Sequence, residues 1–122
     1  MTEWETAVCQ RAVNAYGKDH QLIICMEEMA ELTKELSKNL RGEENIPHIA
    51  EEVADVEIML EQVKLLFNLR EAAADAKEAK LLRLQEMSAK VELKKAEIQA
   101  VFQRWLEDAY GDQITGRTEK PE

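Results

Sequence analysis

The residues best suited to chemistry lie in two short acidic runs of the same pattern, EEMAE and EEVAD. Residues three apart share one side of an α-helix, so a helix through the first run places Glu28 beside Glu31. A helix through the second run likewise places Glu52 beside Asp55. At about 6 Å and an effective dielectric near 20, two like charges repel by roughly 3 kcal/mol. Gathering all four acids therefore predicts protons or a hard divalent cation between them.

Composition favours long helices and argues against nucleic acid or an anionic membrane as a partner. Of the 122 residues, 34% are charged, and only four Gly and two Pro interrupt the chain, which is typical of an all-α protein. The net charge of −9 argues against nucleic-acid or anionic-membrane binding, since both need clustered Lys and Arg. No apolar run is long enough to span a membrane and no signal-peptide pattern is present, so we expect a cytoplasmic protein. Cys9 and Cys25 lack disulfide or zinc spacing, and we expect buried thiols.

Apolar periodicity predicts three helices over residues 2–16, 19–40 and 47–67. Thr2 is expected to cap the first helix and Gly17 to end it, while Asp19 is expected to cap the second. The expected core faces are Leu22, Cys25, Met26, Met29, Leu32, Leu36 and Leu40 on the second helix, and Ile49, Val53, Val56, Leu60, Val63 and Phe67 on the third. The two acid pairs fall on matching flanks of these faces, which allows them to converge.

A fourth helical region covers residues 71–110 without Gly or Pro. Its apolar residues Leu84, Val91, Ile98 and Trp105 recur every seven positions, as in a coiled coil, although Lys94 interrupts the intervening series. The region is either one long helix or two helices broken near 86–90. We expect a single helical domain over 1–110, with residues 111–122 as a polar, flexible tail.

Two other interpretations of the acids are a solvated helix surface and a di-iron site. Acid pairs on a helix are usually solvated, and Glu31 precedes Lys34 as surface ion pairs do. The duplication, and the apolar Ile24, Ile58 and Met59 one turn from the acids, favour a metal site instead. A di-iron carboxylate bundle requires Glu-x-x-His, and the sequence has none.

The combination of Glu28-x-x-Glu31, a spacer of twenty residues and Glu52-x-x-Asp55 resembles the all-α nucleoside triphosphate pyrophosphohydrolases, the MazG-like and dimeric dUTPase superfamily. The stretches HQLIICMEEMAEL and RGEENIPHIAEEVADVEIMLEQVKLLF are similar to small phage- or prophage-type members. The resemblance covers roughly residues 1–85. Residues 86–110 extend beyond a minimal member of that family, which bears on the oligomeric arrangement and not on the acidic motif.

The resemblance implies a helical bundle in which these four acids hold Mg²⁺, with Mn²⁺ as a substitute. It further implies hydrolysis of the α–β phosphoanhydride of a nucleoside triphosphate to a monophosphate and pyrophosphate. A metal ion suits an acidic protein, because it reverses the local field toward the substrate phosphates and activates water.

Other polar residues are assigned by position or by likeness. Glu27 shares a side of its helix with Glu31, and we interpret it as a general base for the attacking water or as an acid supporting the metal ligands. The residues expected to meet phosphate are Lys34, Asn68, Lys80 and Arg83. The substrate's base and sugar leave no signature in the sequence.

We therefore expect an all-α, four-helix-type bundle with an extended C-terminal helix, acting as a Mg²⁺-dependent nucleotide pyrophosphohydrolase. A chain of this length buries a modest core, so a homodimer or homotetramer is expected to complete it. One alternative is a non-catalytic interaction module in which residues 71–110 form a coiled coil. The other is a degenerate relative that binds nucleotide or metal without turnover.

Overall fold

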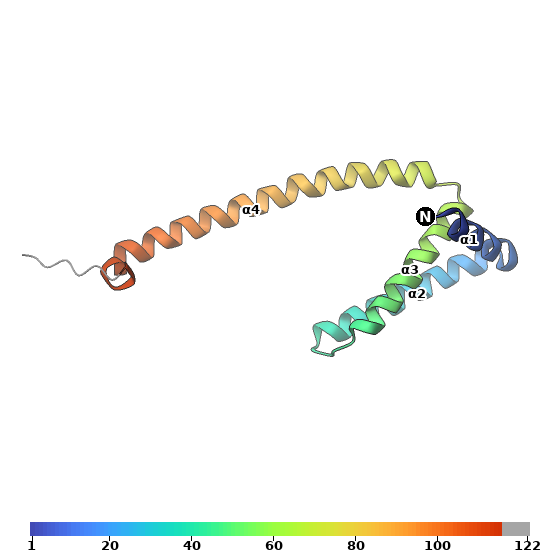
Figure 1. The fold of residues 1–122 in the computed structure, drawn as a ribbon, viewed down its shortest axis with the longest axis horizontal. Coiled ribbons are helices and arrows are strands. Elements are labelled where there is room, and N and C mark those ends of the chain that lie inside the picture. The colour runs from blue at the N-terminus through green and yellow to red at the C-terminus, as the bar shows by residue number, and fades with distance from the viewer. Residues whose placement is uncertain (116–122) are drawn as a thin grey trace, which may run out of the picture. The chain divides into compact units, whose positions relative to one another are not determined.

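In the computed structural model, which describes residues 1–115, the chain forms four helices and confirms the predicted all-α fold with a long C-terminal helix (Figure 1). These are α1 (Glu3–Tyr16), α2 (Lys18–Leu40), α3 (Ile46–Leu66) and α4 (Arg70–Thr115). The chain divides into two compact units, Met1–Asp75 and the residues from Ala76 onward, and each is described by itself. No helix in this described range is long and apolar enough to cross a membrane.

The junction between α1 and α2 is a single glycine. Thr2 caps α1 as predicted, because its hydroxyl accepts a 3.1 Å hydrogen bond from the Glu5 amide. Gly17 has φ +85° and ψ 165°, a conformation open to glycine alone, and this lets α2 begin at once at Lys18. The prediction that Asp19 caps α2 is therefore wrong, and Asp19 lies in the first helical turn.

Helices α2 and α3 pack antiparallel (Figure 1). They hold most of the buried residues of the first unit. Gln21 meets Gln62 at one end of the pair, and Glu35 meets Asn45 at the other. The buried side of α2 therefore passes through Gln21, Cys25 and Glu35. The first turn of α3 contains Pro47, as predicted, and α1 packs on α3 and more lightly on α2.

The predicted core faces are only partly buried. Cys25 is buried as expected, but Met26, Met29, Leu36 and Leu40 on α2 are exposed, and so are Val53, Leu60 and Phe67 on α3. The inward-facing side of the two helices is rotated from the predicted apolar faces toward the acids. Buried polar pairs at both ends of the α2–α3 interface fix this rotation. Cys9 and Cys25 are free, buried thiols, as predicted, and burial is the main cause that raises the pKa of each.

Helix α4 is continuous through residues 86–90, which settles the choice between one helix and two in favour of one. Its only non-helical backbone angles within the described range are at Tyr110, with φ −137° and ψ 23°, where the helix kinks. Residues 111–115 continue the helix beyond this kink. The rest of the predicted flexible tail lies outside the described residues.

Candidate metal centre

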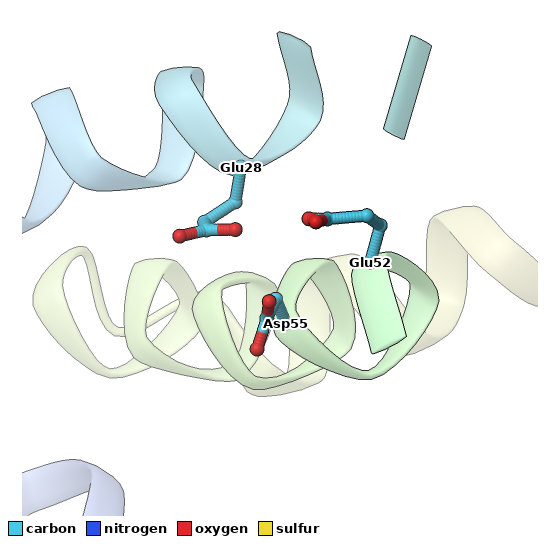
Figure 2. A group of neighbouring side chains, drawn as sticks. All are labelled: Glu28, Glu52 and Asp55. Atoms are coloured by element: carbon cyan, nitrogen blue, oxygen red, sulfur yellow. The ribbon is translucent and has the colours of Figure 1, made fainter. Parts of the chain in front are cut away.

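Three of the four predicted acids converge between α2 and α3. Glu28 extends from α2 toward Glu52 and Asp55 on α3, and each of the three offers one carboxylate oxygen within 4.8 Å of the other two (Figure 2). Glu28 and Glu52 are half-buried, and Asp55 is exposed. The group therefore has a partly enclosed side, formed by the helix interface, and a side open to solvent.

The electrostatics of this group are unfavourable for three free carboxylates. Burial raises the pKa of Glu28, and the neighbouring charges of Asp55 and Glu52 raise it further. Both causes act in the same direction, since each disfavours the ionised form. These surroundings therefore disfavour the charged form of the Glu28 carboxyl.

Glu52 adds an independent sign of a missing partner. Its Oε2 atom is buried, and it accepts no hydrogen bond from any residue that the structure describes. A buried carboxylate oxygen without a donor is costly, because it has lost its hydration without replacement. A cation, a proton or an ordered water would stabilise this oxygen.

One buried polar contact fixes the acids from the side of the α1–α2 junction. Gln21 donates a 2.6 Å hydrogen bond from Nε2 to Oε1 of Gln62, and both side chains are buried. Gln62 also donates to the sulfur of Met59 at 3.4 Å. Gln21 precedes Glu28 by seven residues, which is two helical turns, so this contact sets the rotation of α2 that points Glu28 at α3.

A second buried contact fixes the opposite end. Asn45, just before α3, donates from Nδ2 to the Glu35 carboxylate at 2.6 Å and to the Glu35 carbonyl oxygen at 2.8 Å. The hydrogen bond from Asn45 is the main cause that lowers the pKa of Glu35. Glu35 follows Glu28 by seven residues, and Asn45 precedes Glu52 by seven. The acid group is therefore held between two polar contacts, each two helical turns away.

The donor set and its spacing fit a hard divalent cation. Around a Mg²⁺ ion with bonds of about 2.1 Å, adjacent ligand oxygens lie about 3 Å apart and opposite ones about 4.2 Å apart. Oxygens grouped within 4.8 Å need only small side-chain movements to reach such positions. The group offers carboxylates alone, without sulfur or imidazole, as Mg²⁺ and Mn²⁺ prefer.

The remaining acids predicted for the site are not part of this group. Glu31 is exposed on α2, and it is not among the acids whose carboxylate oxygens lie within 4.8 Å of one another. Glu27 and Lys34 are exposed on the same helix. The roles of Glu31 as a ligand, Glu27 as a base and Lys34 as a phosphate contact stay predictions.

The predicted phosphate contacts from the C-terminal half lie in the link after α3 and on α4. Asn68 follows α3 in an exposed link and has φ +53°, a left-handed conformation that Asn tolerates well. It lies thirteen residues beyond Asp55, or about 20 Å along the helix direction. Lys80 and Arg83 are exposed on α4 in the second unit.

Sequence reasoning missed the four residues of the two polar contacts, although a signal for them exists. Gln21, Glu28 and Glu35 recur every seven residues along α2, with Cys25 and Leu32 between them. This spacing is that of a coiled-coil seam with polar residues in one of its two core positions. The predicted core face of α2 is more apolar than this seven-residue repeat and was therefore chosen in its place.

The fold and the site together define an all-α protein with a carboxylate cluster held between two antiparallel helices. A scan against protein-family models and searches of curated proteins and of solved structures return no match to this chain.

Proposed function

We propose that the chain is a Mg²⁺-dependent nucleoside triphosphate pyrophosphohydrolase that hydrolyses the α–β phosphoanhydride of a nucleotide. The observation that carries this proposal is the convergence of Glu28, Glu52 and Asp55, including the buried Glu52 oxygen that no described residue hydrogen-bonds. The resemblance of the two acidic runs to the pyrophosphohydrolase superfamily supports the same reaction. Mn²⁺ is expected to substitute for Mg²⁺.

In this proposal the three carboxylates hold the cation at the open edge of the α2–α3 interface, where a triphosphate can approach from solvent. A bound divalent ion supplies charge to the phosphate oxygens and acidifies a water molecule. Glu27 lies next to Glu28 on the exposed part of α2 and receives the proton of the attacking water. Lys34 is proposed to neutralise phosphate charge and Asn68 to donate a hydrogen bond to a phosphate oxygen, and the assignment of Lys80 and Arg83 to phosphate stays a prediction from the resemblance.

The enzyme proposal is tested by pyrophosphate release from a panel of canonical and modified nucleoside triphosphates, with and without Mg²⁺. Glu52→Gln keeps the size of the side chain and removes its charge, so we expect a loss of at least about 100-fold in rate. Glu51→Gln is the matched control, because Glu51 is an exposed neighbour on α3. Equal loss in both variants, or release that is independent of metal, would contradict the proposal.

A non-catalytic interaction module is the second proposal, and the exposed apolar side chains of α4 favour it. Under that proposal the nucleotide panel stays silent, and Glu52→Gln leaves self-association unchanged. A degenerate relative would differ from both, because it would bind metal or nucleotide without releasing pyrophosphate.

A further inference from the structure

Helix α4 carries an apolar seam that is open to solvent. Six residues at coiled-coil core spacing along the helix are each more than half exposed, namely Leu84, Met87, Val91, Ile98, Val101 and Trp105. The seam runs from Leu84 to Trp105, about 32 Å along the helix, so it is too extended to be a small surface patch. Apolar surface of this kind marks an interaction face.

The seam contains two apolar hollows with the shape that a coiled coil requires. One is lined by Leu84, Met87, Ser88 and Val91, with Glu92 and Lys95 at its edge. The other is lined by Ile98, Val101, Phe102 and Trp105, with Glu97 at its edge. In both, the four inner residues stand at positions i, i+3, i+4 and i+7, which form the hole that receives one side chain of a facing helix.

Charged residues in the seam exclude a parallel pair of identical helices. Lys77, Lys80, Lys94 and Asp108 occupy core positions of the same seven-residue repeat. In a parallel, in-register pair, each of these would face its own copy and repel it. Four like-charge core layers are a heavy cost for a seam with six apolar residues.

An antiparallel pair centred between residues 92 and 93 removes these four clashes. Lys77 then lies opposite the partner's Asp108, as an ion pair. Lys80 lies opposite the partner's Trp105, where a cation over an aromatic ring is favourable. Lys94 lies opposite the partner's Val91, and its long stem allows the ammonium group to reach solvent.

The same register fills both hollows. Leu84 faces the partner's Val101 and points into the hollow between the partner's Ile98 and the partner's Trp105. By symmetry Ile98 faces the partner's Met87 and points into the hollow there. Leu81, 54% exposed, lies beside the partner's Phe102, 52% exposed, and extends the apolar contact.

We propose that α4 pairs with α4 of a second copy of this chain as an antiparallel coiled coil in this register. This interface rests on α4 alone and is independent of the metal centre. At the edge of the seam, Lys90 faces the partner's Glu97 in this arrangement, whereas a parallel pair would set Lys90 against the partner's Lys95. Arg83 faces the partner's Arg104, and both side chains stand at the solvent edge, where they can separate.

Charge reversal at one position distinguishes the two orientations. We expect Lys90→Glu to weaken self-association of the full chain roughly tenfold by sedimentation equilibrium, because two attractive pairs per dimer become repulsive. Lys90→Glu combined with Glu97→Lys should restore the dissociation constant. In a parallel dimer, Lys90→Glu would tighten association instead.

The matched control for Lys90→Glu is Glu86→Gln. Lys90 forms an ion pair with Glu86 along its own helix, with Nζ and Oε1 3.3 Å apart. Glu86→Gln removes this pair without touching the seam, so we expect an unchanged dissociation constant. An unchanged or lower dissociation constant for Lys90→Glu would overturn the proposal, and so would a full effect of Glu86→Gln.

Disulfide trapping tests the register directly. A chain with Leu84→Cys is mixed with a differently sized chain with Val101→Cys under mild oxidation, and we expect mixed cross-linked dimers to dominate. A parallel pair would give the two self-linked dimers instead, and that outcome, or no cross-link of any kind, would overturn the proposal. The native thiols Cys9 and Cys25 are buried, and the unsubstituted chain serves as the control for them.

Discussion

Gln21 on α2 and Gln62 on α3 share a buried hydrogen bond of 2.6 Å, and each lies seven residues from an acid of the carboxylate group. Gln21 precedes Glu28, and Gln62 follows Asp55. Two helical turns separate the contact from the acids on both α2 and α3. The contact therefore fixes rotation and register at once, which apolar packing alone specifies less sharply.

Removing one partner of this contact should destabilise the fold. Gln21→Ala leaves the buried amide of Gln62 without its partner, and we expect a loss of about 1–3 kcal/mol in the free energy of unfolding. Urea denaturation measures it. Gln21→Leu combined with Gln62→Leu should recover most of the loss, since neither buried amide is then left unpaired and the His20 ring, which also contacts Gln21, is exposed to water. A single variant as stable as the unsubstituted chain would show that the contact contributes nothing.

The helices were predictable from sequence because their signals are local. Thr2 caps α1, Gly17 ends it, and Pro47 lies in the first turn of α3, and each acts on the backbone of its own few residues. The partial convergence of the acids was predictable as well, from their shared spacing. Which side of α2 faces inward was not, because the buried Asn45 contact joins residues ten apart across a turn and outweighs a more apolar stripe.

The long helix shows the same division. The seven-residue repeat of Leu84, Val91, Ile98 and Trp105 is legible in the sequence, and so is the helix that carries it. Whether the helix breaks near 86–90 depends on weak differences in propensity that sequence does not resolve. The position of Glu31 outside the acid group was also beyond prediction, because it depends on the rotation of α2.

The contact between Asn45 and Glu35 should be visible in the pH dependence of stability. A carboxyl with a lowered pKa in the folded state contributes stability above its unfolded pKa, and the contribution is lost as pH falls through the folded pKa. Asn45→Ala removes the main cause of that lowering. We therefore expect the stability of Asn45→Ala to fall less than that of the unsubstituted chain between neutral and acidic pH, as followed by urea denaturation. Parallel curves would contradict this assignment.

The contribution of Glu28 to the pH dependence of stability should have the opposite sign. Its pKa is raised, so the folded state holds more protons than the unfolded state, and stability falls as pH rises from the ordinary carboxyl pKa through the folded one. In the presence of a metal chelator, Glu28→Gln should raise the free energy of unfolding at neutral pH, because it removes the charged form that burial and the neighbouring acids disfavour. Glu27→Gln, on the exposed part of α2, is the control. Destabilisation by Glu28→Gln without metal would argue against crowded charge at this site.

A bound divalent metal should offset the destabilisation that the crowded carboxylates cause. We expect Mg²⁺ to raise the melting temperature of the unsubstituted chain. The free energy of unfolding should gain about 2.7 kcal/mol when the Mg²⁺ concentration is 100 times the dissociation constant. Glu52→Gln and Asp55→Asn should lose most of this gain, and Glu51→Gln should keep it. The gain should shrink toward acidic pH, because protons compete with the cation for Glu28.

This melting experiment separates the site from its proposed activity. A metal-dependent gain without pyrophosphate release would leave the carboxylate group as a cation site and remove the enzyme proposal. No gain in any condition, together with silent calorimetry, would remove both. The free energy that a cation recovers at Glu28, Glu52 and Asp55 is the repulsion that the folded chain otherwise bears, so binding and stability must change together.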